Sequence, residues 1–366
     1  MSAAAGARRV GVITLPSFYE DFAGRERGDK DYRSASRDVA RLLQQMKSQG
    51  VDGVLIDLRN NGGGSLREAI ALTGLFIDRG PVLQQRNADG QVNVLSDREA
   101  GVTWDGPLGV LINRGSASAS EIFAAAIQDY GRGVVMGEPS FGKGTVQTVV
   151  DLDRVARSDK PRLGELRVTM AQFFRINGGT TQLRGVTPDI VFPVITDLES
   201  VGESSYDNAL PWTQLPPARY TVLGDVRQAL PEIQARHKAR AANDPDYKSL
   251  ADEVTELKRQ RAAKVISLNE AQRRKERDAQ LKRLAAREAA NDPNGGAALV
   301  KALADDGLMP DERALASQLA AEKARKAAKD VLLDEAARIV GDQAELLRGA
   351  RVVAGNGSGT SVGKPD

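Results

Sequence analysis

Two reactive side chains stand 25 positions apart in turns rich in glycine and serine. Ser118 lies in residues 115–121 (GSASASE), and Lys143 lies in residues 141–144 (FGKG). A serine is a poor nucleophile until an adjacent base removes its proton. The chain has no cysteine, and its one histidine, His237, lies in a basic stretch far from both turns. A serine hydrolase built from this sequence would therefore use a lysine as its base.

The serine turn follows an apolar strand and precedes a helix. The first amides of a helix lack intrahelical partners and carry the positive end of its dipole, which suits an oxyanion. Three serines alternate here, and the local sequence leaves open which of Ser116, Ser118 and Ser120 would react. Ser118 and Glu121 also have the spacing of a capping box, so a purely structural cap is the competing interpretation.

Gly62, Gly63 and Gly64 directly follow the buried strand expected at residues 54–58. Glycine lets the backbone approach a ligand closely, and exposed N–H groups here could complete an oxyanion hole. The alternative is a tight turn that needs positive φ. Because this turn has the same strand-to-helix placement as the serine turn, we expect the two to line one crevice of an open α/β sheet.

The lysine loop nearly matches a phosphate-binding loop. Residues 137–143 fit G-x-x-x-x-G-K, but Gly144 stands where Ser or Thr should follow, and a strand comes next in place of a helix. These two departures exclude nucleotide binding. The remaining interpretations are a surface lysine, or a lysine held in an apolar cleft that favours the neutral amine of a general base. Gln147 lies four residues on, where it could hydrogen-bond the amine.

Apolar patterning predicts an α/β fold for the first two hundred residues, since strands and helices alternate there. The expected strands are 10–15, 54–58, 108–112 and 134–136, with extended segments at 146–150 and 166–174. The expected helices of this part are 34–49, 66–76 and 120–130. Alanine, arginine, lysine and glutamate dominate afterwards and predict helices at 225–236, 247–287 and 314–347.

Composition excludes several classes of function. A net charge of +2 gives no electrostatic case for nucleic acid. The lack of cysteine excludes a disulfide framework and a thiolate metal site, and we expect neither a metal nor a cofactor. No apolar run approaches the ~18 residues of a membrane helix, and the small, polar start of the chain has no apolar stretch of a signal peptide.

Four segments together resemble the carboxyl-terminal processing peptidases, in particular the tail-specific proteases of Gram-negative bacteria. They are residues 57–64 (DLRNNGGG), 116–126 (SASASEIFAAA), 137–147 (GEPSFGKGTVQ) and 185–190 (GVTPDI). Residues 207–212 (DNALPW) and the helical tail resemble the C-terminal extension of that subgroup. The resemblance covers nearly everything from Val10 to about Leu347.

The resemblance implies a crotonase-like α/β protease core with a helical C-terminal extension, and a Ser-Lys catalytic pair. It makes Ser118 the nucleophile, Lys143 the general base and Gln147 the group that orients the lysine. The Ala119 amide and a glycine amide from Gly63 or Gly64 would form the oxyanion hole. Glu121 and Asp129 match further family positions, to which we assign a structural role.

The implied activity is that of a serine endopeptidase that cleaves proteins whose C-terminal ends are nonpolar or unstructured. The alternatives are a non-catalytic crotonase-like binding or assembly module, and a weaker one, a hydratase-type acyl-CoA enzyme. Only the protease needs the Ser-Lys spacing. Expected partners are protein or peptide substrates and an adaptor protein on the helical C-terminal domain, and the family implies the periplasm.

The domain boundaries follow from the change in composition and from the resemblance. We expect a leader (1–9), the protease core (10–199), a connector (200–223), a helical C-terminal domain (224–350) and a disordered tail (351–366). Family members place a PDZ domain, a further N-terminal region and an export signal before this core. The sequence is therefore expected to be a C-terminal piece that does not read the carboxylate of a substrate's tail.

Overall fold

The computed structural model describes residues 8–157, 163–194, 196–223, 225–263, 265, 267–291, 319 and 329–356. The chain divides into two compact units: residues 1–238 together with 335–366, and residues 239–334. Among the described residues, no helix is both long enough and apolar enough to cross a membrane.

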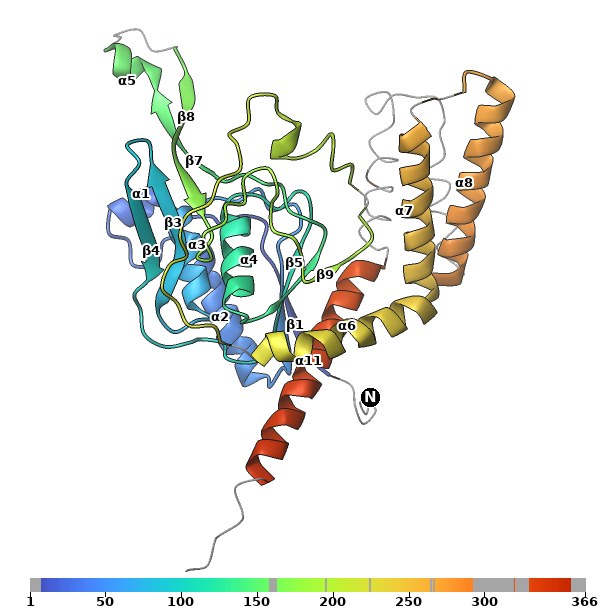
Figure 1. The fold of residues 1–366 in the computed structure, drawn as a ribbon, viewed down its shortest axis with the longest axis horizontal. Helices are drawn as coiled ribbons and strands as arrows, with labels where there is room; N and C mark the ends of the chain where they lie inside the picture. Colours follow the sequence, from blue (N-terminus) through green and yellow to red (C-terminus); the bar gives the residue numbers. More distant parts are fainter. Residues whose placement is uncertain are drawn as a thin grey trace, which may run out of the picture. The chain divides into compact units, whose positions relative to one another are not determined.

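The first unit is built on a parallel five-stranded sheet with the strand order β1-β2-β5-β6-β9. Figure 1 labels β1, β5 and β9 of this sheet. Its strands are β1 (Val10–Thr14), β2 (Gly53–Asp57), β5 (Leu108–Ile112), β6 (Val134–Gly137) and β9 (Ile190–Val191). The helices that precede or join these strands are α1 (Phe22–Glu26), α2 (Ala35–Ser48), α3 (Leu66–Gly74) and α4 (Ala119–Asp129). The four predicted strands and three predicted helices of this region are confirmed to within a few residues, and the α/β fold class with them.

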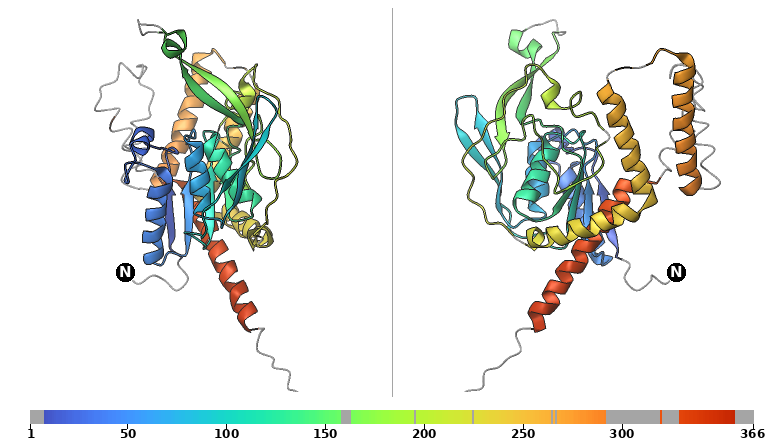
Figure 2. Two further views of the ribbon diagram at one scale, coloured as in Figure 1. Left: turned by 90° about the vertical axis from the view of Figure 1, so that its left-hand side faces the viewer. Right: turned by 45° about the vertical axis from the view of Figure 1, so that its right-hand side comes forward.

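A second, antiparallel sheet has the order β4-β3-β8-β7. Its strands are β3 (Gly80–Asn87), β4 (Val92–Asp97), β7 (Thr145–Asp151) and β8 (Glu165–Phe174), with α5 (Leu152–Ala156) between the last two. β7 and β8 form a hairpin, and α5 lies at its far end (Figure 2). The extended segments 146–150 and 166–174 are confirmed, whereas the pattern did not reveal β3 and β4.

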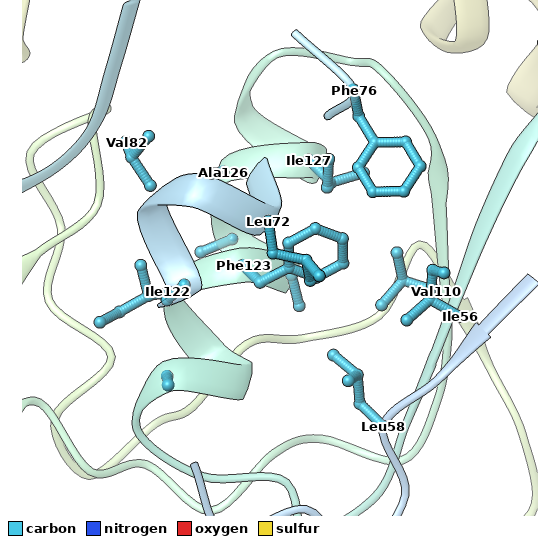
Figure 3. Close-up of a cluster of buried hydrophobic side chains, with 14 of the residues drawn as sticks. Ile56, Leu58, Leu72, Phe76, Val82, Val110, Ile122, Phe123, Ala126 and Ile127 are labelled. Atoms are coloured by element: carbon cyan, nitrogen blue, oxygen red, sulfur yellow. The ribbon is translucent and has the colours of Figure 1, made fainter. Parts of the chain in front are cut away.

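Helices cover both faces of the parallel sheet, which explains why β2 and β5 are buried along their whole length. One face packs on α3 and α4 around Phe123, and the aromatic and aliphatic side chains of this core interdigitate in Figure 3. The other face packs on Val340 of α11 (Val331–Asn356), against which a side chain at Gly53 or Gly109 would find no room. The two glycines therefore let this helix approach the sheet.

The described part of the C-terminal region is helical, as predicted, but the boundaries of all three predicted helices differ. The helix predicted at 247–287 is two helices, α7 (Pro245–Ala263) and α8 (Glu270–Asn291), because the Asn269 side chain accepts the N–H of Gln272 and caps the start of α8. α6 (Asp225–Asn243) and α11 run beyond their predicted ends. Within the helix predicted at 314–347, all of residues 314–328 except 319 lie outside the described residues, and so does the tail from residue 357.

Candidate active site

Three neighbouring strands of the parallel sheet each lead into one of the three motif loops. β2 ends before the glycine turn, β5 ends before the serine turn, and β6 ends before the lysine loop. The strands pair in register at these ends, Asp57 with Leu111 and Ile112 with Gly137. Because all carboxyl ends of a parallel sheet lie at one edge, the topology brings the three loops together. The shared edge was expected for the glycine and serine turns, and the lysine loop joins them there.

Ser118 has an unusual backbone conformation at the start of α4. Its φ is 56° and its ψ is −111°, a region that residues with a side chain rarely adopt. The turn is fixed by its neighbours, since the Ala117 N–H donates to the Asn61 carbonyl at 3.0 Å. A strained turn between strand and helix is also the device by which α/β hydrolases present a nucleophilic serine.

The structure distinguishes the three serines that the sequence left open. Ser116 is fully buried and its hydroxyl donates to the Leu58 carbonyl at 2.8 Å. Ser120 is fully buried too, and its hydroxyl donates to the Asn61 carbonyl at 2.8 Å. Both side chains tie the serine turn to the glycine turn. Ser118 is partly exposed, so it is the one of the three that a substrate can reach.

A single carboxylate joins the serine turn to the lysine loop. Oε2 of Glu121 accepts the backbone N–H of Ser118 at 2.8 Å and that of Lys143 at 3.0 Å. Its Oε1 accepts the Gly142 N–H and the Ser140 hydroxyl, both at 2.7 Å. The amide nitrogens of Ser118 and Lys143 are therefore no farther apart than the sum of their two distances to Oε2. Glu121 caps the helix, as the capping-box spacing indicated, and also sets the separation of the two loops.

Burial raises the pKa of Glu121 to about 7, because the carboxylate is removed from water, while the hydrogen bonds from Ser140, Gly142, Ser118 and Lys143 oppose this shift. The side chain is fully buried. Four donors around one carboxyl group favour the ionised form, since a protonated carboxyl has fewer acceptor positions. The ionisation of Glu121 thus falls near neutral pH.

Lys143 and Gln147 contact one another as the sequence indicated. The lysine Nζ donates to Oε1 of Gln147 at 3.0 Å, and Gln147 lies on β7, two residues into the strand. The loop around the lysine is fixed by its backbone: the Phe141 N–H donates to the Ser116 carbonyl at 2.9 Å, and the Leu183 N–H donates to the Gly142 carbonyl at 2.8 Å. The two residues that precede the lysine are therefore fixed, and the first of these bonds holds the loop beside the serine turn.

The two glycines predicted for the oxyanion hole differ in the use of their amides. The Gly63 N–H donates to Oδ1 of Asn61 at 2.9 Å and is therefore occupied. Gly64 forms a parallel bridge with Phe18 that uses the Gly63 carbonyl and the Ser65 N–H, so its own N–H points away from Phe18. Gly64 is exposed, which leaves its amide accessible to a substrate.

Ala119 carries the other amide that the sequence predicted for the oxyanion hole. It is the first residue of α4, whose first N–H groups have no intrahelical acceptor. A Cβ atom built on Gly63 would stand 3.1 Å from the Ala119 nitrogen, so the glycine turn lies directly against this amide. The geometry therefore favours Ala119 and Gly64 as the pair of donors, with Gly63 and Asn61 shaping the turn.

Asp129 lies at the other end of α4 and binds structural partners. Its Oδ1 accepts from Arg175 Nη2 at 2.6 Å and from Asn177 Nδ2 at 2.8 Å, and its Oδ2 accepts from Arg175 Nε at 3.1 Å. The side chain is 3% exposed. This geometry fits the structural role assigned to Asp129 and gives it no contact with Lys143.

Two buried residues of the site, Asn61 and Gln182, were not predicted from the sequence. Asn61 is fully buried and its Nδ2 donates to the Leu15 carbonyl at 2.8 Å, which anchors the glycine turn to the end of β1. Gln182 is fully buried and its Oε1 accepts the Gly144 N–H at 2.8 Å. Asn61 lies within a recognised motif, so its position carried a signal. Gln182 follows a glycine pair in an ordinary polar loop, and nothing local marks it.

Comparisons with known proteins agree with this architecture. Residues 9–192 match the model of peptidase family S41, and residues 196–345 match that of the C-terminal domain of tail specific protease (DUF3340). The tail-specific protease of Haemophilus influenzae is 42% identical over 274 residues, which cover 74% of this chain and 38% of that protein. The carboxy-terminal-processing protease of Bartonella bacilliformis is 38% identical over 167 residues, 45% of this chain and 36% of that protein.

A solved structure of a photosystem II D1 C-terminal processing protease shares 31% sequence identity with the chain, at a TM-score of 0.40. That alignment covers 54% of this chain and 46% of that structure. The chain thus spans less than half the length of these relatives.

Proposed function

Because the chain belongs to peptidase family S41, we propose that it is a serine endopeptidase in which Ser118 is the nucleophile and Lys143 the general base. The observation that carries this proposal is the shared contact of Ser118 and Lys143 with one carboxylate oxygen of Glu121, at 2.8 and 3.0 Å. This contact supports the proposal because the backbone N–H groups of the strained, partly exposed serine and of the only lysine of the motif loops share one acceptor atom. No histidine lies in any of these loops.

The proposed reaction has two steps. Neutral Lys143 accepts the proton of the Ser118 hydroxyl as Oγ attacks the scissile carbonyl carbon, and the lysine then passes that proton to the leaving amine. A water molecule next attacks the acyl group, gives its proton to Lys143, and releases the carboxylate product as Ser118 Oγ regains a proton. Gln147 keeps the amine in position throughout.

The negative charge that develops on the carbonyl oxygen requires donors that are already in place. The amides of Ala119 and Gly64 are supported for this role by their positions, one at the start of α4 and the other exposed at the glycine turn. Both are backbone groups, so substitution of the Ala119 side chain by serine is expected to have a mild effect.

The proposed substrates are proteins with nonpolar or unstructured C-terminal ends, in line with the names of the tail-specific and carboxy-terminal-processing relatives. Two unfolded substrates that differ only in their last two residues, Ala-Ala and Asp-Asp, measure whether residues 1–366 read the tail. Equal rates for the two tails would show that residues 1–366 do not read the tail. Strong discrimination would place a tail-reading surface within this chain.

The nucleophile is tested by substitution and by covalent labelling. Ser118→Ala should abolish cleavage of an unfolded substrate and labelling by a fluorophosphonate, whereas Ser116→Ala and Ser120→Ala should retain part of both. Unchanged cleavage by the Ser118→Ala protein would show that Ser118 is not the nucleophile. Absence of cleavage and of labelling in the wild-type protein would instead favour a non-catalytic module with the same fold.

An adaptor contact on the helical C-terminal region and a periplasmic location stay predictions. The unit of residues 239–334 contains α7 and α8, whose exposed faces carry pairs of opposite charge such as Arg274 with Glu270 at 2.7 Å. Substituting charges on these faces while measuring cleavage of a free and of an adaptor-delivered substrate would test the contact. Equal delivery by the wild-type and the substituted proteins would contradict it.

A further inference from the structure

Residues 198–206, called here the strap, lie against both the serine turn and the lysine loop. They begin just inside the region that matches the C-terminal domain of tail specific protease, residues 196–345. One buried side chain, Arg114, holds the strap in place. Its guanidinium donates to four acceptors, the carbonyls of Ser140 (2.5 Å), Val201 (2.6 Å) and Leu198 (3.3 Å) and the hydroxyl of Ser204 (3.2 Å).

Arg114 directly precedes the serine turn, so this one side chain joins the start of that turn, the lysine loop and the strap. It is 4% exposed, and burial lowers its pKa, an effect that Glu121 and Glu138 oppose. A buried cation is stable only when it is paired or hydrogen-bonded, and the acceptors of the strap satisfy this need. Gly202 packs against the guanidinium so closely that a side chain there would have no room. The strap is therefore shaped around Arg114.

Glu203 of the strap reaches the backbone on both sides of Lys143. On one side, its N–H donates to the Phe141 carbonyl at 3.0 Å. On the other side, its Oε1 accepts from Nε2 of Gln182 at 3.0 Å, and Oε1 of Gln182 accepts the Gly144 N–H at 2.8 Å. Glu203 thus fixes the orientation of the Gln182 amide.

The orientation of the Gln182 amide matters because this side chain is buried. The side chain is fully buried, so an amide group left without its partners would carry an unmet desolvation cost. With Glu203 in place, the NH₂ group faces the carboxylate and the oxygen faces Gly144. Without Glu203, nothing in this chain of bonds would hold the oxygen toward the Gly144 amide.

We propose that Glu203 of the strap is a positioning residue for Lys143, acting through Gln182 and through the backbone of Phe141 and Gly144. This inference rests on the proposed function for its catalytic consequence, but not for its structural one. It means that the start of the C-terminal domain helps to complete the active site of the peptidase core. A misplacement of about 1 Å at a catalytic group can lower a rate by about 100-fold, so a loosened lysine loop should reduce turnover.

The structural consequence is tested by hydrogen–deuterium exchange in the absence of substrate. Glu203→Ala should speed exchange of the Gly144 amide by about tenfold or more, because Gln182 is no longer oriented. Glu203→Gln keeps an acceptor oxygen at the same place and should preserve the protection. Glu199→Ala removes an exposed carboxylate from the same segment and serves as the matched control. Unchanged Gly144 exchange in Glu203→Ala would overturn the inference.

The catalytic consequence is tested by steady-state cleavage of fluorescently labelled casein. Glu203→Ala should lower kcat by about tenfold with a smaller change in KM, and should alter the pH profile of kcat/KM, while Glu203→Gln and Glu199→Ala stay near the wild type. Faster exchange without any change in kcat or in the pH profile would overturn the catalytic part. An inactive wild-type protein that still shows the exchange pattern would contradict the proposed function and leave the role of the strap in the loop supported.

Discussion

Gly63 lies so close to Ser118 that a Cβ atom built on the glycine would stand 2.9 Å from the serine Cβ. The same atom would stand 2.9 Å from the Ala117 carbonyl oxygen, and the φ of Gly63 is 107°. The glycine turn and the serine turn are thus packed directly on one another. The width of the proposed oxyanion hole depends on this contact.

Gly63→Ala should strongly reduce proteolysis, because the new methyl group has no space and the backbone angle is unfavourable for alanine. Loss of one oxyanion donor costs about 100- to 1000-fold in rate, and displacement of the turn should approach this range. Gly62→Ala is the matched control, since no atom lies within 4 Å of a Cβ there. Initial rates of casein cleavage measure both variants, and equal rates for the two would contradict the prediction.

Lys143→Arg should be inactive although it keeps the positive charge. Arginine stays protonated at any accessible pH and cannot accept the proton of Ser118. Loss of a general base costs about 100- to 10,000-fold, which a fluorogenic assay resolves. Lys47→Arg, on α2, controls for the substitution itself. Activity of Lys143→Arg at the wild-type level would show that another group is the base.

Glu121→Gln should change how stability depends on pH. The pKa of Glu121 is raised from about 4.5 to about 7, so between these values the folded chain holds a proton that the unfolded chain has lost. The contribution of Glu121 to the free energy of unfolding is therefore largest below pH 4.5, and it is lost as the pH rises through 7. Glutamine does not titrate.

Urea unfolding at several pH values measures this effect. Relative to Glu121→Gln, the wild-type free energy of unfolding should fall by at most about 1.4 kcal/mol per pH unit between about pH 4.5 and 7. Glu199→Gln, at an exposed carboxylate, should give a curve parallel to that of the wild type. A parallel curve for Glu121→Gln would show that this carboxyl group is not shifted.

Asp129→Ala should destabilise the fold more than it affects the chemistry. Removal of the carboxylate leaves Arg175 without its partner at 2.6 Å, and breaking a buried pair costs about 3 kcal/mol or more. Chemical denaturation measures the loss, and a double-mutant cycle with Arg175→Ala should show strong coupling. At a temperature where the variant is folded, fluorophosphonate labelling of Ser118 should persist. A folded variant that fails to label would assign Asp129 a role in the reaction.

The sequence determined the elements whose patterns are local. The apolar runs of β1, β2, β5 and β6 and the amphipathic spacing of α2 are properties of short windows, and glycine marks the turns between them. Three turns at strand ends, together with the parallel order of the strands, were sufficient to bring Ser118, Lys143 and Gln147 into one region. Because the three motifs are short and local, their spacing along the chain was sufficient to match a known family.

Only the tertiary structure decided which hydroxyl and amide groups of the motif loops are free of other hydrogen bonds, and which contacts hold these loops in place. β3 and β4 form because β3 pairs with β8, about ninety residues away, and no local window records that pairing. The preference for Ser118 over Ser116 and Ser120 rests on long-range hydrogen bonds from the other two serines to Leu58 and Asn61. The preference for Gly64 over Gly63 rests on the bond from the Gly63 N–H to the Asn61 side chain within the same turn. Glu203 and Gln182 contact the backbone on either side of Lys143 from distant parts of the chain. Such contacts are set by packing, because burial forces each polar group to find its partner wherever the fold places one.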